Sequence, residues 1–364
     1  MNYNYFMPVR IIYGKDCIKN NTDVFKKLGK RAFIATSKSL YKNNYLKDLL
    51  DILNSLNVEY QIYDKCLPNP TTKQVQEMGN IAKSYDYCIA FGGGSTIDAV
   101  KACAVMGRND ITVAQLYNQE FDEVMPIVAI PTTAGTGSEV TSNAVLTTDV
   151  DGYLTKKSVF HEKMYPTYAF LDAAYTVNMP LELTRASALD ALTHSIEGFL
   201  STKATPIGEI FAKESIKIFA DNYEALKNGE LSLENRQELL LGSTYAGIVI
   251  ALEKTTAPHA MSYALTTHNN ISHGNATGLL IAAFVDRCYN NAKEKVETIL
   301  SLLSLNNVDE LYKYIDVLID KDFTVSQQQL KEYAAQCWEV VNSKPNPVEF
   351  DEQSVFDLYK KSLI

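Results

Sequence analysis

The sequence predicts two domains, an N-terminal α/β domain built on a parallel sheet and a C-terminal domain made only of helices. The chain has 364 residues, more than one hydrophobic core usually supports, so two domains are expected. Short apolar runs alternate with amphipathic stretches in the first half, as parallel strands joined by helices do. From about Pro180, β-branched runs become rare and helical periodicity continues to the end. We place the domains at residues 1–178 and 179–364.

The apolar runs of the first half have the length of strands, and the stretches between them have helical spacing. The run PIVAI at 126–130 is apolar throughout, which is typical of a strand buried on both faces of a sheet. The sequence therefore predicts strands at 31–36, 58–63, 87–91 and 126–130, and helices at 46–56, 73–84 and 96–106.

The composition excludes several classes of protein. The net charge of −9 argues against binding to nucleic acid or to an anionic membrane surface. No apolar run approaches the ~20 residues that span a bilayer, and the first residues lack the pattern of a signal peptide. The six cysteines form no CxxC pair and are expected to be buried, reduced thiols. We expect a cytoplasmic protein whose partners are small molecules.

The segment GGGSTID, from Gly92 to Asp98, lies between a predicted strand and a predicted helix. Glycines allow the backbone to approach a phosphate, and the N-terminus of the helix offers free N–H groups and a partial positive charge. Ser95 and Asp98 also fit a capping box that would fix the start of this helix. A tight turn without a ligand explains this segment equally well, because it matches neither GxGxxG nor a Walker loop.

A second loop, PTTAGTGSEVTSNA at 131–144, follows the last predicted strand directly. Hydroxyls and backbone N–H groups at the carboxyl end of a parallel sheet suit phosphate, ribose and carboxamide contacts. A solvated surface loop is the alternative, but two such loops at equivalent strand ends favour a nucleotide. The hydroxyl residues of this loop include Thr132, Thr133, Thr136, Ser138 and Thr141.

Histidine is rare in the chain, which makes its positions informative. Asp190 and His194 are four residues apart in an apolar helical stretch, so they project from one helix face. A hydrogen bond between them would explain this pair without a metal. His259 and His273, each at a predicted helix start, favour a metal site instead. One carboxylate and three imidazoles suit Fe²⁺, Zn²⁺ or Ni²⁺ better than Mg²⁺.

Four segments in order, GGGSTIDAVK, PTTAGTGSEVTSNAV, ALDALTHSIEGFLS and HAMSYALTTHNNISHG, resemble the iron-containing (group III) alcohol dehydrogenase family. The resemblance runs from Tyr13-Gly14 to Asn346-Pro347. It implies a Rossmann-like N-terminal domain, a helical C-terminal domain, the architecture also found in dehydroquinate synthase, and a homodimer. It further implies NAD or NADP, a divalent ion (Fe²⁺ first) and interconversion of a small, polar alcohol and its aldehyde.

The resemblance assigns roles to individual residues. The metal ligands would be Asp190, His194, His259 and His273, and the ion would act as a Lewis acid during hydride transfer. The pyrophosphate of the nucleotide would lie on Gly93, Gly94 and Ser95. The rest of the cofactor site would be formed by Asn69, Thr132, Thr133, Thr136, Thr141 and Lys156.

Two positions depart from the pattern of the family. Members commonly have a second histidine four residues after the third ligand, where this chain has Tyr263; we name Tyr263, rather than nearby His268, as a candidate proton relay. A tyrosine there also resembles branches that reduce sulfoacetaldehyde or phosphonoacetaldehyde. Ser37 stands where many NAD-preferring members have Asp. Without that negative charge NADP becomes permissible, and Lys38 or Lys42 could contact its phosphate.

Two other functional classes remain open from the sequence. A lyase resembling dehydroquinate synthase would use the same architecture and NAD only transiently. A nucleotide-binding scaffold without catalysis is the other, although all four ligand positions hold competent donors.

Overall fold

The computed structural model describes residues 3–150, 153–319 and 323–364, which form two compact units. The sheet unit comprises Phe6–Thr133 and Ser138–Asn178. The helical unit comprises Ala134–Gly137 and Met179–Ile364, with the first residues of the chain up to Tyr5. The main division thus lies between residues 178 and 179, and a short part of the second glycine-containing loop packs with the helices.

The sheet unit is built on six parallel strands in the order β1-β8-β5-β4-β2-β3. Their bounds are β1 Arg10–Tyr13, β2 Arg31–Thr36, β3 Glu59–Tyr63, β4 Tyr87–Gly92, β5 Ile127–Pro131 and β8 Tyr168–Leu171. The helices are α1 Asp23–Leu28, α2 Lys38–Lys42, α3 Lys47–Ser55, α4 Thr72–Ala82, α5 Gly94–Met106 and α6 Val113–Tyr117. All seven predicted elements are confirmed within one or two residues at each end.

The central strands are buried on both faces, because alternate side chains enter two separate cores. Phe33 and Ala35 of β2 pack in one core with residues of α4 and α5. Ala32 and Ile34 of the same strand pack in the other core with residues of α1 and α3. A sheet that is covered on both faces requires strands that are apolar throughout, without alternation of apolar and polar residues, and the sequence contains such strands.

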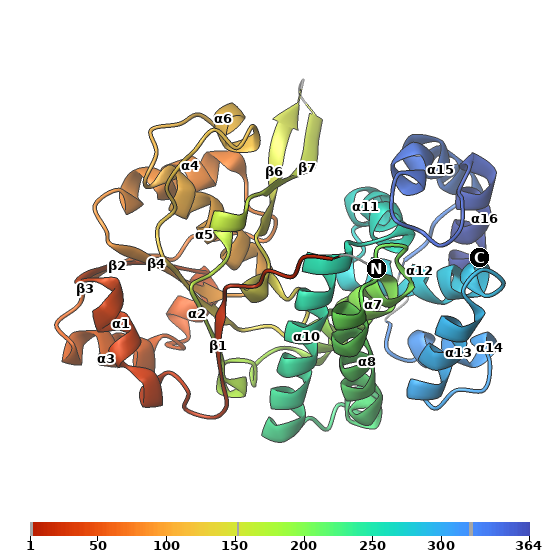
Figure 1. Cartoon of the computed structure of the whole chain (residues 1–364), viewed down its shortest axis with the longest axis horizontal. Helices are drawn as coiled ribbons and strands as arrows, with labels where there is room; N and C mark the ends of the chain where they lie inside the picture. Colours follow the sequence, from red (N-terminus) through yellow and green to blue (C-terminus); the bar gives the residue numbers. More distant parts are fainter. Residues whose placement is uncertain (1–2, 151–152, 320–322) are drawn as a thin grey trace. The chain divides into compact units, whose positions relative to one another are not determined.

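Several elements of the sheet unit were not predicted. β1 and β8 are strands of four residues, too short to give a periodic signal. β6 (Asn143–Val150) and β7 (Tyr153–Phe160) form an antiparallel hairpin that projects from this unit (Figure 1). This hairpin is rich in threonine and lysine, so it lacks the apolar run that marks a buried strand. Short 3₁₀ turns lie at Lys19–Asn21, Ser138–Val140, Glu162–Met164 and Ala173–Tyr175.

The strand order reverses between β2 and β4, because β3 lies on one side of β2 and β4 on the other. Connections that leave neighbouring strands in opposite directions open a crevice at the carboxyl ends of those strands. The residues that follow β2 and β4, Ser37 and Gly93, therefore lie at the usual ligand position of an open parallel sheet.

The helical unit contains no strand among the residues described, as predicted for 179–364. α7 packs against α8, α10 and α12 and is the centre of this unit. None of the helices described is both long and apolar enough to span a membrane. The helices are α7 Leu181–Leu200, α8 Pro206–Asp221, α9 Tyr223–Asn228, α10 Leu233–Glu253, α11 Ala257–Asn269, α12 His273–Cys288, α13 Lys293–Leu302, α14 Val308–Asp316, α15 Gln327–Asn342 and α16 Glu352–Leu363.

Candidate functional site

The turn after β4 presents the start of α5 without a side-chain cap. Gly93 is the N-cap residue, and a Cβ built on it would lie 3.1 Å from the side chain of Thr133. The predicted capping box is wrong, because the Ser95 hydroxyl accepts from the Asn69 N–H at 3.2 Å and Asp98 binds a different segment. A 13-residue helix with an uncapped, glycine-lined start is a suitable anion site.

Three predicted cofactor residues that are far apart in the sequence, Asn69, Ser95 and Lys156, are linked by hydrogen bonds and strand pairing in the fold. Asn69 has a left-handed backbone (φ 55°), which asparagine adopts more readily than most residues. Besides donating to Ser95, Asn69 accepts from the Thr147 hydroxyl at 3.2 Å. Thr147 lies directly opposite Lys156 in the β6–β7 hairpin. The hairpin thus brings a lysine to the neighbourhood of the start of α5.

The predicted threonines are less uniform in position. Thr132 follows β5 and its N–H donates to the Gly92 carbonyl at 3.1 Å. The Thr141 hydroxyl is buried and accepts from the Lys101 ammonium at 3.0 Å. Thr136 belongs to Ala134–Gly137, which packs with the helical unit.

Ser37 directly follows β2 and caps α2, where its hydroxyl accepts from the Leu40 N–H at 3.4 Å. Lys38 and Lys42 belong to the same short helix. No carboxylate stands at position 37, so the local charge does not oppose a phosphate.

A buried lysine that sequence reasoning missed joins α5 to the second glycine-containing loop. Lys101 is 0% exposed, and its Nζ donates to the Ser138 hydroxyl (2.8 Å) as well as to Thr141. Asp98, one turn earlier, accepts from the Ser138 hydroxyl at 2.5 Å and lies 3.5 Å from the ammonium. Burial lowers the pKa of Lys101 to about 8, although Asp98 and Glu139 oppose this effect. The i, i+3 spacing of Asp98 and Lys101 on a predicted helix could have shown this pair.

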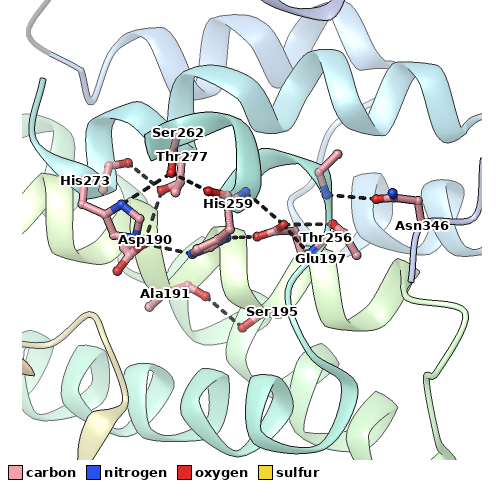
Figure 2. Close-up of polar contacts among 12 residues, drawn as sticks. Asp190, Ala191, Ser195, Glu197, Thr256, His259, Ser262, His273, Thr277 and Asn346 are labelled. Carbon is pink, nitrogen blue, oxygen red and sulfur yellow. Dashed lines mark hydrogen bonds and ion pairs between the residues drawn. The ribbon is translucent and has the colours of Figure 1, made fainter. Parts of the chain in front are cut away.

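The candidate metal ligands come from the starts or the middle of three helices of the helical unit (Figure 2). Asp190 and His194 lie on α7 and are buried. His259 lies in the first turn of α11, and His273 is the first residue of α12. The two helix starts predicted at these histidines are confirmed.

Three of the four candidate ligands converge on one point. Asp190 Oδ1 lies 3.5 Å from His259 Nε2 and 3.8 Å from His273 Nε2. One ligand atom from each of these residues lies within 4.8 Å of the other two. The ring of His194 stacks on that of His259, with 4.4 Å between centroids, but His194 is not part of this group of three.

One imidazole nitrogen at this point has unused hydrogen-bonding capacity. Nε2 of His259 is buried and makes no hydrogen bond among the residues described, although Asp190 Oδ1 lies 3.5 Å away. Buried polar atoms rarely remain unpaired, so such atoms indicate a ligand. One carboxylate with borderline nitrogen donors fits a divalent transition ion.

Burial and mutual contact set the charges of this cluster. Burial lowers the pKa of His194 to about 4, although Asp190 opposes the effect. Burial alone would raise the pKa of Asp190, but His194, His273 and His259 together hold it well below its usual range. The aspartate is therefore ionised at neutral pH, as a metal ligand must be.

Behind the ligands lie residues that sequence reasoning missed. Glu197 of α7 is fully buried, and its carboxylate forms a hydrogen-bonded ion pair with His259 Nδ1 (Figure 2). Ser262 lies with its hydroxyl 3.5 Å from His273 Nδ1. Glu197 is three residues after His194 and seven after Asp190, so it lies on the same helix face. This spacing was the available signal.

Gly274 allows α12 to begin close to α7. A Cβ built on Gly274 would lie 1.9 Å from the carbonyl oxygen of Ala186, which no side chain could tolerate. The adjacent His273 reaches Asp190 because the two helices approach so closely here.

Tyr263 lies one turn after His259 on α11, and its ring is parallel to that of His273 with 6.1 Å between centroids. The residue is 40% exposed, yet the protein around its hydroxyl, with Asp190 and Glu197, raises its pKa. A raised pKa makes the phenol a donor at neutral pH rather than a base. His268 is exposed and stacks on Tyr333, with 5.3 Å between the ring centroids.

Comparison with known proteins gives matches over nearly the whole chain. A family model described as "Iron-containing alcohol dehydrogenase" matches residues 8–173, and one described as "Fe-containing alcohol dehydrogenase family, C-terminal" matches residues 184–363. The NAD-dependent methanol dehydrogenase of Bacillus methanolicus is 31% identical, covering 74% of this chain and 72% of that protein. The sulfoacetaldehyde reductase of Bilophila wadsworthia is 30% identical, covering 83% and 79% respectively.

Solved structures match the chain over its whole length, including both domains. An iron-containing alcohol dehydrogenase from Thermotoga maritima has a TM-score of 0.90 at 34% identity, covering 100% of this chain and 99% of the other. The sulfoacetaldehyde reductase of Bifidobacterium kashiwanohense, in complex with NAD+, has a TM-score of 0.89 at 26% identity with the same coverage.

Proposed function

The chain belongs to the iron-containing alcohol dehydrogenase family, and from this premise we propose that it reduces a small, polar aldehyde to the alcohol, reversibly. The cofactors would be NAD or NADP and a divalent ion, Fe²⁺ first. The observation that carries the proposal is the convergence of Asp190, His259 and His273 within 4.8 Å, where the buried Nε2 of His259 makes no hydrogen bond among the described residues.

Each part of the chemistry has candidate residues. When bound, the nicotinamide supplies a hydride and the ion supplies a Lewis acid that polarises the carbonyl oxygen. Asp190, His194, His259 and His273 would hold the ion. Gly93, Gly94 and Ser95 would hold the pyrophosphate at the start of α5, together with Asn69, Thr132, Thr133, Thr136, Thr141 and Lys156.

Tyr263 would donate the proton that the product oxygen requires. A phenol is protonated at neutral pH, so Oη can donate a hydrogen bond and a proton to the product oxygen. We propose reduction as the direction of the reaction.

We propose that both NADH and NADPH are accepted. Ser37 follows β2 at the reversal point of the sheet and carries no charge, while Lys38 and Lys42 lie on the same short helix. Nothing at this position repels a 2′-phosphate.

Within the class of small aldehydes, we favour anionic two-carbon substrates, sulfoacetaldehyde or phosphonoacetaldehyde. The support is the similarity to two sulfoacetaldehyde reductases and the tyrosine at position 263. Similarity of the same degree to a methanol dehydrogenase makes neutral aldehydes the necessary comparison. We also propose a homodimer.

The decisive experiment follows NADH absorbance at 340 nm with the purified protein, Fe²⁺ and neutral or sulfonated aldehydes. A dehydrogenase consumes NADH stoichiometrically, whereas a lyase that uses NAD transiently does not. His259→Ala should lose both bound metal and activity. His268→Ala, which changes an exposed histidine of the same helix, should retain both. If His259→Ala keeps its metal content and its activity, the assignment of the metal centre is wrong.

A further inference from the structure

We propose that Glu197 is a positioning residue of the metal centre, which fixes the ring of His259 and supplies the second negative charge that a divalent ion requires. The inference rests on the metal centre of the proposed function and goes beyond its four ligands. It assigns a role to a buried carboxylate that contacts no substrate or cofactor.

Glu197 is held in place from several sides. One carboxylate oxygen, Oε1, accepts from the backbone N–H of Thr256 at 2.8 Å and from the Thr256 hydroxyl at 2.9 Å. The other oxygen, Oε2, pairs with Nδ1 of His259 (Figure 2). All three residues are 5% exposed or less. A fully buried carboxylate with this many fixed donors has essentially one orientation.

This orientation determines which nitrogen of His259 is available. An ionised carboxylate only accepts hydrogen bonds, so Nδ1 must carry the proton. A neutral ring, which is the form that binds a metal, then has its lone pair on Nε2. This atom points to Asp190 at 3.5 Å and makes no hydrogen bond among the described residues. A carboxylate behind a ligating histidine also makes the ring more basic, which strengthens its bond to a metal.

The other two histidines have weaker supports. His273 Nδ1 faces the Ser262 hydroxyl, a neutral group, at 3.5 Å, and that hydroxyl donates to the His259 carbonyl at 2.9 Å. Among the described residues no side chain hydrogen-bonds His194 Nδ1, and the ring's backbone contact with Gly135 is to a neutral group. Among these contacts, only that of Glu197 places a carboxylate on the ring nitrogen of a candidate ligand.

The charge of Glu197 matters independently of the ring orientation. Asp190 and Glu197 place two negative charges in the buried centre, which one divalent ion balances when the three imidazoles are neutral. Removing the charge of Glu197 leaves a net positive charge away from water, which is costly. The loss should therefore weaken ion binding even where the ligands themselves are intact.

The test measures ion affinity with full-length protein stripped of metal, using Zn²⁺ in competition with a chromophoric chelator. Glu197→Gln keeps the size of the side chain but removes its charge, and should weaken Zn²⁺ binding about 10–100-fold. Ser262→Ala is the matched control behind His273 and should weaken binding by about fivefold at most.

A second measurement does not depend on a mutant folding correctly. In Zn²⁺-loaded wild-type protein labelled with ¹⁵N-histidine, the His259 Nδ1–H should give a downfield, exchange-protected proton resonance. His259→Ala, used only to assign the signal, should lack this resonance. Thr256→Val, which removes one donor to Glu197, should keep the resonance and weaken binding less than Glu197→Gln does.

The outcomes separate this inference from the proposed function. Wild-type protein that binds no divalent ion would overturn the metal centre and this inference with it. If the wild type binds Zn²⁺ tightly and the Kd of Glu197→Gln is within twofold of the wild-type value, this inference is wrong but the metal centre stands. Absence of the Nδ1–H resonance from metal-loaded wild-type protein would do the same. Weakened binding in Glu197→Gln, with the resonance present in the wild type, supports the inference.

Discussion

Gly274→Ala should disrupt the metal centre although residue 274 is not a ligand. The added Cβ would lie 1.9 Å from the Ala186 carbonyl oxygen. Real Cβ contacts are not shorter than 3.0 Å, so the start of α12 must move by about 1.1 Å from α7. Because His273 is the adjacent residue, its Nε2 moves by a similar distance from Asp190. Metal–ligand distances tolerate only about 0.2 Å.

We expect Gly274→Ala to lower stability by about 1–3 kcal/mol, as overpacking does, and to weaken Zn²⁺ binding at least about tenfold. Gly278→Ala is the matched control on the same helix, where the new Cβ would lie 3.3 Å from the side chain of Leu189. Alanine has the better helix propensity, by about 1 kcal/mol, which offsets this tight contact, so the stability of this variant should stay within about 1 kcal/mol of wild type and its Zn²⁺ affinity should be unchanged.

The assays are thermal unfolding with and without Zn²⁺, and chelator competition for affinity. If Gly274→Ala binds Zn²⁺ within twofold of wild type and unfolds at the same temperature, the close approach of α12 to α7 does not position His273. A loss of affinity in both glycine variants would also contradict the reasoning, because only one of them forces the helices apart.

Four further predictions concern the ion and the nucleotide. Removing metal by chelation should lower the unfolding temperature, and a divalent ion at 100 times its Kd should restore about 2.7 kcal/mol; an ion-independent transition would contradict the metal site. Burial lowers the pKa of Lys101 from 10.5 to about 8, so between these pH values the unfolded chain holds a proton that the folded protein does not. Stability from this group should rise with pH across that window, and Lys101→Met should lack this component in urea titrations. Ser37→Asp should lower kcat/KM with NADPH at least about tenfold relative to NADH. An unchanged ratio would show that residue 37 does not lie next to the 2′-phosphate. Tyr263→Phe should reduce kcat for aldehyde reduction by about 100-fold without changing Zn²⁺ affinity, and unchanged turnover would exclude it as the proton donor.

The elements that the sequence predicted correctly are those with a strong local signal. Strands β2, β4 and β5 are apolar runs because both of their faces are buried, and helices α3 and α4 have periodic apolar faces. The β6–β7 hairpin has neither signal. Its position depends on pairing between its own strands and on the hydrogen bond from Thr147 to Asn69, 78 residues earlier in the chain.

The capping box shows how a local rule can be overridden. Ser95 and Asp98 have the residue types and spacing of the motif, yet Asp98 instead binds Ser138 and the Val145 N–H. These partners lie 40 and 47 residues later in the chain. The buried hydrogen-bond network around Lys101 replaces the local hydrogen bond of the capping box. Its partners are distant in the sequence, so the residues next to Asp98 do not reveal it.

By itself, the sequence determined the two-domain α/β and helical architecture, because hydrophobic periodicity and length are local properties. It also predicted four donor residues, Asp190, His194, His259 and His273, of which the structure brings Asp190, His259 and His273 together. Only the tertiary structure placed Glu197 behind His259 and brought Gly274 against Ala186. Those contacts join helices that are far apart in the chain, and they depend on packing at the scale of single ångströms.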